Sequence, residues 1–396
     1  MKTVVLAVMV GALITTPAPY PGVERPTPGG HESRQSQPAT PPETSFPPPS
    51  ADEPIGSERN ARVARPMPPD PAERATIALT FLAGPLTDEQ LDEAARAAPN
   101  IRVIRNLDRQ SALDHAAVAD GVDGRLVTAE FLERAVRLSW IHSPSAGVER
   151  IVSMRGLAER PSIVLTNSRG VHGPAIADHA MAMLLSLTRR LPHYAQAQSK
   201  GLWTGREPSE RAITLSGRTM LVVGLGGIGT EVARRAHGFG MRLIATRRSQ
   251  SPSPPFVDRV GSPDDLPAMI GEADVVVICV PLTRETLGLF NAAMIARMKP
   301  GAYLINMARG RIVDTGALIE ALTSGRLAGA GLDVTDPEPL PDGHPLWSAP
   351  NVVITPHISA DGELTDRRWW ALYADNMRRF GAGEPLLNVV DVAAEY

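Results

Sequence analysis

Residues 218–249 read RTMLVVGLGGIGTEVARRAHGFGMRLIATRRS, and this stretch decides the fold. The apolar run before the glycines predicts a buried strand, and Gly224, Gly226 and Gly229 follow it with the spacing G-x-G-x-x-G. In such a motif the first glycine allows a tight turn, the second lets the backbone approach a pyrophosphate, and the third lets the next helix pack closely. The positive end of that helix faces the phosphates. With a further strand over residues 241–246, the stretch predicts a dinucleotide-binding unit rather than a glycine-rich structural turn.

Further apolar runs recur along the chain and predict a doubly wound parallel sheet. Four of them join the two strands above to make a set of six, with helical segments between several of them. The four runs are 274–280, 302–307, 328–334 and 351–356, and the helical segments include 291–298 and 314–325. Upstream, apolar runs alternate with helical patterns again and predict a second α/β lobe. Its predicted strands are 77–82, 101–104, 138–148 and 162–170, with a helix over 86–98. A long helix over 175–191 is expected to join the two lobes.

The N-terminal part of the chain has a different composition. Sixteen of the 37 prolines fall within residues 17–71, and this predicts a disordered, Pro-rich linker over 19–74. The apolar segment in residues 1–18 resembles a secretory signal peptide, although its cleavage site is poor. The alternative is that translation starts at Met67. Export therefore stays open, with the cytoplasm slightly favoured because the soluble dinucleotide pool lies there.

The composition excludes several classes of protein. Forty Lys and Arg residues balance 43 Asp and Glu residues, whereas a dedicated nucleic-acid binder carries a basic excess. Cys279 is the single cysteine, which excludes an intramolecular disulfide framework and a Cys-based zinc site. His172, Asp178 and His179 lack partners at ligand spacing, so helix packing or capping is favoured and no metal site is predicted. Outside the first residues, no apolar run reaches the roughly 20 residues that span a bilayer.

Polar side chains follow three of the predicted strands, where ligands of doubly wound sheets bind. Arg309, Glu338 and His357 each follow a different strand. A histidine can donate a proton near neutral pH to a carbonyl oxygen that gains charge as hydride arrives, and a nearby carboxylate keeps the imidazole charged and oriented. A guanidinium can bind a carboxylate with two parallel hydrogen bonds. Singly, each residue is explained by a surface or loop role, but together they predict hydride chemistry on a 2-keto acid.

The end of the second strand of the glycine unit predicts the choice of cofactor. Folds that prefer NAD carry an acidic residue there, which binds the ribose hydroxyls and repels a 2′-phosphate. The chain instead reads Thr246-Arg247-Arg248-Ser249, and two guanidiniums can pair with a phosphate. NADP(H) is therefore the predicted cofactor. NAD(H) is the alternative, if both arginines point to solvent.

Four stretches of the chain make it similar to the D-isomer-specific 2-hydroxyacid dehydrogenases, which include D-lactate, phosphoglycerate and glyoxylate/hydroxypyruvate enzymes. They are residues 222–241, 276–322, 327–341 and 351–359. The resemblance spans about residues 138–391, with a weaker match back to about residue 75. It implies a two-lobed α/β fold. A Rossmann NAD(P)-binding domain would cover 175–359, and a flavodoxin-like substrate-binding domain would combine 75–174 with 360–391.

The resemblance also implies roles for particular residues. Its catalytic triad falls on Arg309, Glu338 and His357, in agreement with the interpretation from the residues alone. The loop Ser145-Ala146-Gly147 would offer backbone N–H groups to the substrate carboxylate, beside Arg309. The implied cofactor-binding set is Gly224, Gly226, Gly227, Ile228, Gly229, Thr246, Arg247, Arg248, Val280, Pro281, Thr286, Met307, Ala308, Asp333 and His357. A homodimer built mainly from the cofactor lobes is implied as well. Since corepressors share this fold, a nucleotide-sensing binding protein is the alternative to an enzyme.

Overall fold

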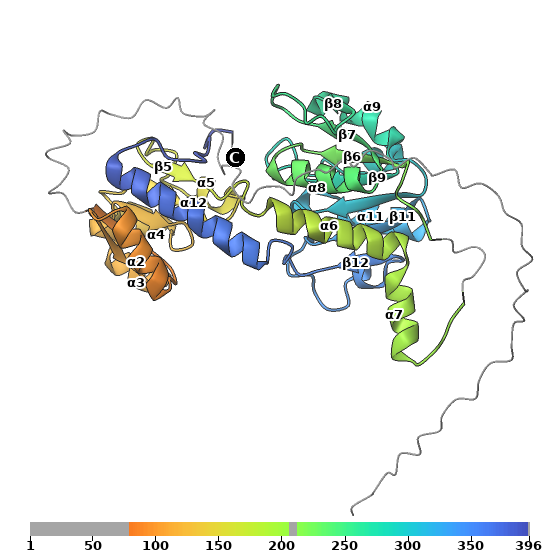
Figure 1. The fold of residues 1–396 in the computed structure, drawn as a ribbon, viewed down its shortest axis with the longest axis horizontal. Helices are drawn as coiled ribbons and strands as arrows, with labels where there is room; N and C mark the ends of the chain where they lie inside the picture. Colours follow the sequence, from red (N-terminus) through yellow and green to blue (C-terminus); the bar gives the residue numbers. More distant parts are fainter. Residues whose placement is uncertain (1–78, 206–211, 395–396) are drawn as a thin grey trace, which may run out of the picture. The chain divides into compact units, whose positions relative to one another are not determined.

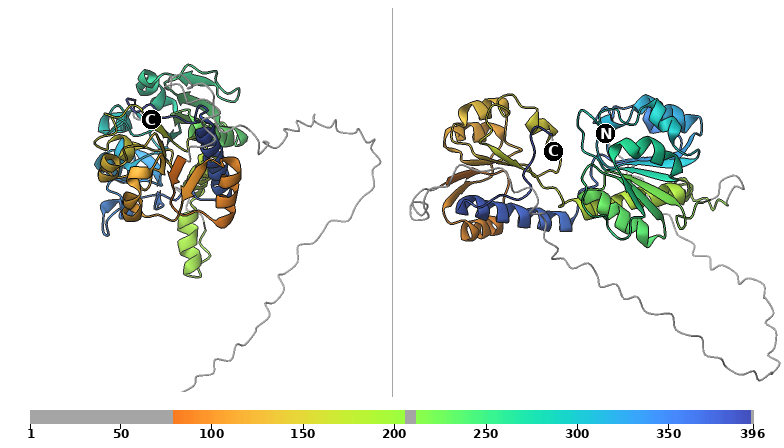
Figure 2. Two further views of the ribbon diagram at one scale, coloured as in Figure 1. Left: turned by 90° about the vertical axis from the view of Figure 1, so that its left-hand side faces the viewer. Right: turned by 90° about the horizontal axis from the view of Figure 1, so that it is seen from above.

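The structure is a computed structural model that describes residues 79–205 and 212–394. The predicted signal segment and Pro-rich linker therefore lie outside the described residues. Two parallel β-sheets form the described part of the chain, one N-terminal and one C-terminal, and helices lie on both faces of each sheet (Figures 1 and 2). This is the predicted α/β fold class. No helix in residues 79–205 or 212–394 is long and apolar enough to cross a bilayer.

The N-terminal sheet has five parallel strands in the order β2-β1-β3-β4-β5, which is a flavodoxin-like order. The strands are β1 (Leu79–Leu82), β2 (Ile101–Ile104), β3 (Gly121–Asp123), β4 (Trp140–His142) and β5 (Val164–Thr166). Its helices are α2 (Asp88–Ala97), α3 (Arg109–Asp114), α4 (Ala129–Arg134), α5 (Glu149–Val152) and, from the far end of the chain, α12 (Glu363–Ala382). We call this body the substrate lobe. Strand β3 was missing from the predicted set because three residues show no usable alternation.

The interior of the substrate lobe mixes aromatic and polar side chains. Trp140 lies between Phe81 and Phe380, with ring centroids 4.9 and 5.0 Å away, so α12 is packed onto the sheet. The neighbouring His142 is fully buried and its Nδ1 lies 3.0 Å from the Thr166 hydroxyl. Burial lowers the pKa of His142 to about 4, because water no longer stabilises the charged imidazole.

The C-terminal sheet has seven parallel strands in the order β12-β11-β10-β9-β6-β7-β8. They are β6 (Thr219–Val223), β7 (Arg242–Thr246), β8 (Arg259–Gly261), β9 (Val275–Ile278), β10 (Ala302–Asn306), β11 (Leu327–Leu332) and β12 (Val352–Ile354). Six strands were predicted, and the seventh is β8, a three-residue edge strand. The order reverses between β6 and β9, as in dinucleotide-binding sheets, whose ligands bind at that switch point. We call this body the cofactor lobe.

Helices cover both faces of the cofactor lobe. They are α6 (Gly173–Thr188), α7 (Leu191–Ser199), α8 (Gly227–Gly238), α9 (Leu266–Met269), α10 (Ala292–Arg297) and α11 (Thr315–Thr323). Strands β6, β9 and β10 are buried along their whole length, between two hydrophobic clusters. Cys279 follows β9 and keeps a small exposed surface, while burial of its thiol raises the pKa to about 12.

The long helix predicted over 175–191 is two helices. Helix α6 ends at Thr188, and Arg190 then adopts a left-handed backbone with a φ of 59° before α7 begins. Pro192 falls in the first turn of α7, where its missing N–H carries no penalty. In Figure 1, α7 leads away from α6. Helix α6 itself packs on α8 and on strands β10 to β12.

Candidate active site

The glycine turn between β6 and α8 has the geometry that a pyrophosphate requires. Gly224 has a φ of 99°, which L side chains rarely adopt. A Cβ on Gly229 would lie 2.2 Å from the Gly224 carbonyl oxygen, so helix and strand are in direct backbone contact. A Cβ on Gly226 would meet nothing within 4 Å, so the space beside this backbone is open. Gly227 and Ile228 begin α8, whose N-terminal N–H groups suit an anion. The turn therefore fits a dinucleotide.

The end of β7 is tied to the glycine turn. The Thr246 carbonyl oxygen accepts hydrogen bonds from Gly224 N (3.0 Å) and Leu225 N (2.9 Å). Arg247 follows, and its Nη1 donates to the carbonyl oxygen of Pro252 at 3.3 Å, while the Arg248 side chain is exposed. Two arginines and no carboxylate thus stand at the position where the ribose of a bound dinucleotide is expected.

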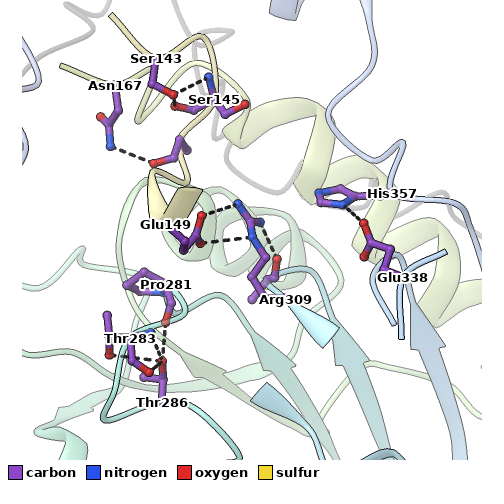
Figure 3. Close-up of polar contacts among 12 residues, drawn as sticks. Ser143, Ser145, Glu149, Asn167, Pro281, Thr283, Thr286, Arg309, Glu338 and His357 are labelled. Atoms are coloured by element: carbon purple, nitrogen blue, oxygen red, sulfur yellow. Dashed lines mark hydrogen bonds and ion pairs between the residues drawn. The ribbon is translucent and has the colours of Figure 1, made fainter. Parts of the chain in front are cut away.

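The loop after β9 borders the same turn. Val280 is a close neighbour of Gly224, whose Cβ, if present, would lie 2.8 Å from Val280 Cγ1. The Thr286 hydroxyl donates to the Pro281 carbonyl oxygen at 2.6 Å and accepts from Thr283 N at 2.8 Å (Figure 3). The Thr286 side chain therefore fixes the shape of the loop.

His357 and Glu338 form a hydrogen-bonded pair at the ends of β12 and β11. His357 Nδ1 lies 2.7 Å from Glu338 Oε1 (Figure 3). These two strands are neighbours in the sheet, so the loops that follow them emerge side by side. His357 has a φ of 56°, an uncommon conformation for a residue other than glycine.

Asp333 holds the His357 loop in place. Its buried carboxylate accepts hydrogen bonds from the Thr355 hydroxyl (2.7 Å), Ile358 N (2.9 Å) and Ser359 N (3.1 Å). Burial alone would raise the pKa of Asp333, but these hydrogen bonds outweigh it and hold the pKa below its usual range. Asp333 was predicted to contact the nicotinamide. Its carboxylate also holds the loop that carries His357.

One of the histidines weighed as a metal ligand takes part in the same network. His179 Nε2 lies 2.9 Å from the Thr355 hydroxyl, which links α6 to β12. Over the described ranges 79–205 and 212–394, no group of three or more His, Cys, Asp or Glu side chains is placed to hold a metal ion.

Arg309 follows β10 and pairs with a residue that the sequence did not single out. Its Nε lies 3.2 Å from Oε1 of Glu149, and its Nη2 lies 3.5 Å from Oε2 (Figure 3). A Cβ on Gly147 would lie 1.8 Å from Arg309 Nη2, so the guanidinium rests against the Gly147 backbone. Met307 and Ala308 connect β10 to Arg309, and the Ala308 N–H is held by the Asn306 side chain at 3.0 Å. The one available signal for Glu149 was its place directly after the substrate loop.

The loop Ser145-Ala146-Gly147 is held from two sides. Ser145 N donates to the Ser143 hydroxyl at 3.3 Å, and Asn167 donates to the Ala146 carbonyl oxygen at 2.8 Å (Figure 3). Within the described residues, the N–H groups of Ala146 and Gly147 have no hydrogen-bond acceptor. Two backbone donors beside Arg309 therefore remain available to an anion.

A doubly wound sheet with a dinucleotide turn and, at the same edge, a His–Glu pair and an arginine defines a nicotinamide-dependent oxidoreductase. Residues 181–359 match the family model "D-isomer specific 2-hydroxyacid dehydrogenase, NAD binding domain". The chain belongs to the D-isomer-specific 2-hydroxyacid dehydrogenase family. It is an NAD(P)-dependent oxidoreductase that acts on CH–OH donors.

Several relatives share most of their length with this chain. Glyoxylate/hydroxypyruvate reductase B of Pectobacterium carotovorum is 36% identical over 296 residues, which cover 73% of this chain and 91% of the relative. A D-isomer specific 2-hydroxyacid dehydrogenase from Xanthobacter autotrophicus, solved with NADPH and MES, is 30% identical with a TM-score of 0.69, covering 81% of this chain and 100% of its own. An NADPH-dependent glyoxylate/hydroxypyruvate reductase from Sinorhizobium meliloti, solved with NADP and sulfate, is 27% identical with a TM-score of 0.68, covering 80% and 100%.

Proposed function

We propose that the protein transfers hydride between NADPH and a small 2-keto acid, with His357 and Glu338 as the proton relay and Arg309 as the substrate anchor. The observation that carries this proposal is the 2.7 Å contact between His357 Nδ1 and Glu338 Oε1, on the sheet edge where Arg309 also lies. A histidine with a carboxylate on one nitrogen is arranged to donate a proton from the other.

The His–Glu pair accounts for the proton. Because Nδ1 is engaged by Glu338, Nε2 is the atom left to protonate the carbonyl oxygen of the substrate. The Glu338 carboxylate at hydrogen-bond distance also fixes the orientation of the imidazole ring. The left-handed backbone at His357, held by Asp333, fixes the ring before substrate arrives. When bound, the reduced nicotinamide supplies the hydride that the carbonyl carbon receives.

Arg309 and the substrate loop account for orientation. The guanidinium can take the substrate carboxylate in a two-bond fork, and it rests against Gly147 of the loop that carries the N–H groups of Ala146 and Gly147. The same positive charge stabilises the developing negative charge on the carbonyl oxygen. Binding and polarisation would then come from one side chain.

Glyoxylate and hydroxypyruvate are the proposed substrates. The relatives from Pectobacterium and Sinorhizobium carry both names, and both compounds are small 2-keto acids that an arginine and two backbone N–H groups can hold. The two compounds differ by a hydroxymethyl group, whose recognition depends on the contacts that the pocket offers to its hydroxyl. The choice between the two therefore needs measurement.

NADPH is the proposed cofactor over NADH. Arg247 and Arg248 follow β7, where a carboxylate would repel a 2′-phosphate, and they offer charge-assisted hydrogen bonds to that phosphate instead. Two of the solved relatives bind NADPH or NADP, which supports the same choice.

A homodimer is the proposed assembly. Large apolar side chains gather on and just after α7 and are exposed, namely Leu191, Tyr194, Leu202 and Trp203. Trp203 is fully exposed, which is unusual for so large an apolar side chain and is typical of a surface that a partner covers. Light scattering at micromolar concentration should give a dimer. A strictly monomeric species would overturn this assembly and leave the catalytic proposal standing.

The cytoplasm is the proposed location, since the reaction draws on a soluble dinucleotide pool. Mass spectrometry of protein from its native host should find Met67 as the first residue. A mature N-terminus just beyond residue 18, in protein recovered outside the cytoplasm, would establish export instead.

Turnover tests the function directly. Purified protein is mixed with NADPH and a panel of 2-keto acids that includes glyoxylate, hydroxypyruvate, pyruvate and phenylpyruvate, and absorbance at the nicotinamide band is followed. Oxidation of NADPH by at least one small 2-keto acid is expected. Binding of NADPH without turnover of any panel member would overturn the proposal and favour a nucleotide-sensing binding protein.

A further inference from the structure

The donors of Arg309 are divided unequally between the protein and the space beside it. A guanidinium has five N–H donors in one plane. Nη1 donates to the Ala308 carbonyl oxygen at 2.7 Å, and Glu149 engages Nε at 3.2 Å and Nη2 at 3.5 Å. Two hydrogen bonds and one ion-pair contact thus hold the guanidinium, and no other acceptor contacts its nitrogens among the residues that the structure describes.

The guanidinium of Arg309 has a side edge and an end edge. Glu149 occupies the side edge, which Nε and one N–H of Nη2 form. Nη1 donates to the carbonyl oxygen of Ala308, the residue before Arg309. Nη1 and Nη2 each carry a second N–H, and the end edge that these two nitrogens form is the fork that matches a carboxylate. Glu149 does not occupy that end edge, because it contacts Nε and Nη2 from the side.

We propose that Glu149 is a positioning residue, which holds the side edge of Arg309 so that its end edge faces the substrate carboxylate. This inference rests on the proposed function of Arg309. An arginine side chain has several rotatable bonds, and ordering it during substrate binding costs free energy that a fixed partner removes in advance. Glu149 would therefore act on substrate affinity through Arg309, without touching the substrate itself.

The place of Glu149 in the fold suits this role. It is the first residue of α5, and only Val148 separates it from the substrate loop, so one short segment carries both the backbone donors and the carboxylate. Gly147 lets the guanidinium approach the loop, since its missing Cβ would lie 1.8 Å from Nη2 and 2.7 Å from Glu149 Oε2. Any side chain at residue 147 would displace the pair.

The first test separates Glu149 from a general structural role. In Glu149→Gln the side chain keeps its size, but its amide N–H₂ opposes the donors of Arg309. KM for the best 2-keto acid should rise by about tenfold or more, while kcat changes less than threefold and the NADPH dissociation constant stays unchanged. Glu272→Gln is the matched control, because Glu272 pairs with Arg259 and Arg242 just before β9, at the opposite ends of the strands.

A double-mutant cycle shows whether Glu149 acts through Arg309. Arg309→Lys keeps the charge but has no side edge, so adding Glu149→Gln to it should change KM less than threefold. An unchanged KM in Glu149→Gln alone, or the same rise in both backgrounds, would overturn the proposal. A lower KM would also overturn it, since Glu149 would then compete with the substrate. If wild-type protein turns over no 2-keto acid, the proposed function fails first, and that result is distinct from any of these.

Discussion

The two lobes share a parallel-sheet architecture but put their polar side chains in different places. In the cofactor lobe, strands β6 and β9 are apolar and buried throughout their central residues, and the residues assigned to chemistry come after the strands end. In the substrate lobe, strands of three residues carry polar side chains inside the core, such as Asp123 and His142. The residues assigned to chemistry therefore lie outside the buried strands of the cofactor lobe, whereas the substrate lobe buries polar side chains within its strands.

The largest expected effect comes from the edge of the cofactor lobe. His357→Ala and Arg309→Ala should each nearly abolish turnover, since loss of a positioned proton donor alone typically costs on the order of 10²–10⁴ in rate. Both side chains lie beyond the ends of their strands and outside the hydrophobic clusters, so the melting temperature and NADPH binding should stay close to wild type. Steady-state kinetics, thermal melts and cofactor titration check this, with His193→Ala on the exposed face of α7 as control. Wild-type kcat in either variant would show that the roles are wrong.

The next effect concerns the core of the substrate lobe and acts on stability. The pKa of buried His142 is lowered to about 4 by desolvation, whereas an unfolded histidine titrates near 6.5. Between these pH values His142 is protonated in the unfolded chain but not in the folded chain. The free energy of unfolding therefore falls as the pH drops from about 6.5 to 4. The full difference is about 3 kcal/mol.

Chemical denaturation at several pH values measures this loss. His142→Asn keeps a polar group near the Thr166 hydroxyl but cannot titrate, so its stability should fall less steeply than that of wild type below pH 6.5. His193→Asn, which changes an exposed histidine, serves as the control. Equal slopes for His142→Asn and wild type would mean that the substrate lobe accommodates the charged imidazole, and the contrast between the lobes would weaken.

The smallest effect returns to the cofactor lobe, at the end of β7. Wild-type protein should prefer NADPH over NADH by at least about tenfold in kcat/KM, which needs only about 1.4 kcal/mol. Arg247→Asp should move that preference toward NADH, because a carboxylate repels a 2′-phosphate and binds the ribose hydroxyls. Arg242→Asp makes the same change of charge at the other end of β7 and should leave the preference alone. If the wild-type protein prefers NADH, the assignment of a 2′-phosphate site to these arginines is wrong.

The cofactor lobe was the more predictable of the two because its pattern is local. The glycine unit is one continuous stretch, and its strand, turn and helix appear where the residues 218–249 predict them. His357 and Glu338 could be assigned to the ends of two strands of one sheet, because β11 and β12 were both visible as apolar runs in the sequence. The sequence did not predict that β11 and β12 are neighbours; the structure shows that they pair in the sheet.

The errors have physical causes that a single sequence does not display. Strands β3 and β8 are three residues long, too short for a hydrophobic period. The break at Arg190 is different, because Pro192 two residues later was a visible signal that a new helix begins there. The pairing of Glu149 with Arg309 joins segments 160 residues apart on two different sheets, and no periodicity encodes such a contact.

The state of Cys279 gives the protein a practical property. It is the single thiol of the chain, and a pKa of about 12 leaves almost none of it as thiolate, the form that alkylating reagents attack, at neutral pH. Cys279 should therefore react only slowly with maleimide dyes at neutral pH. A cysteine introduced at an exposed position can therefore carry a dye at one chosen place without removal of the native residue.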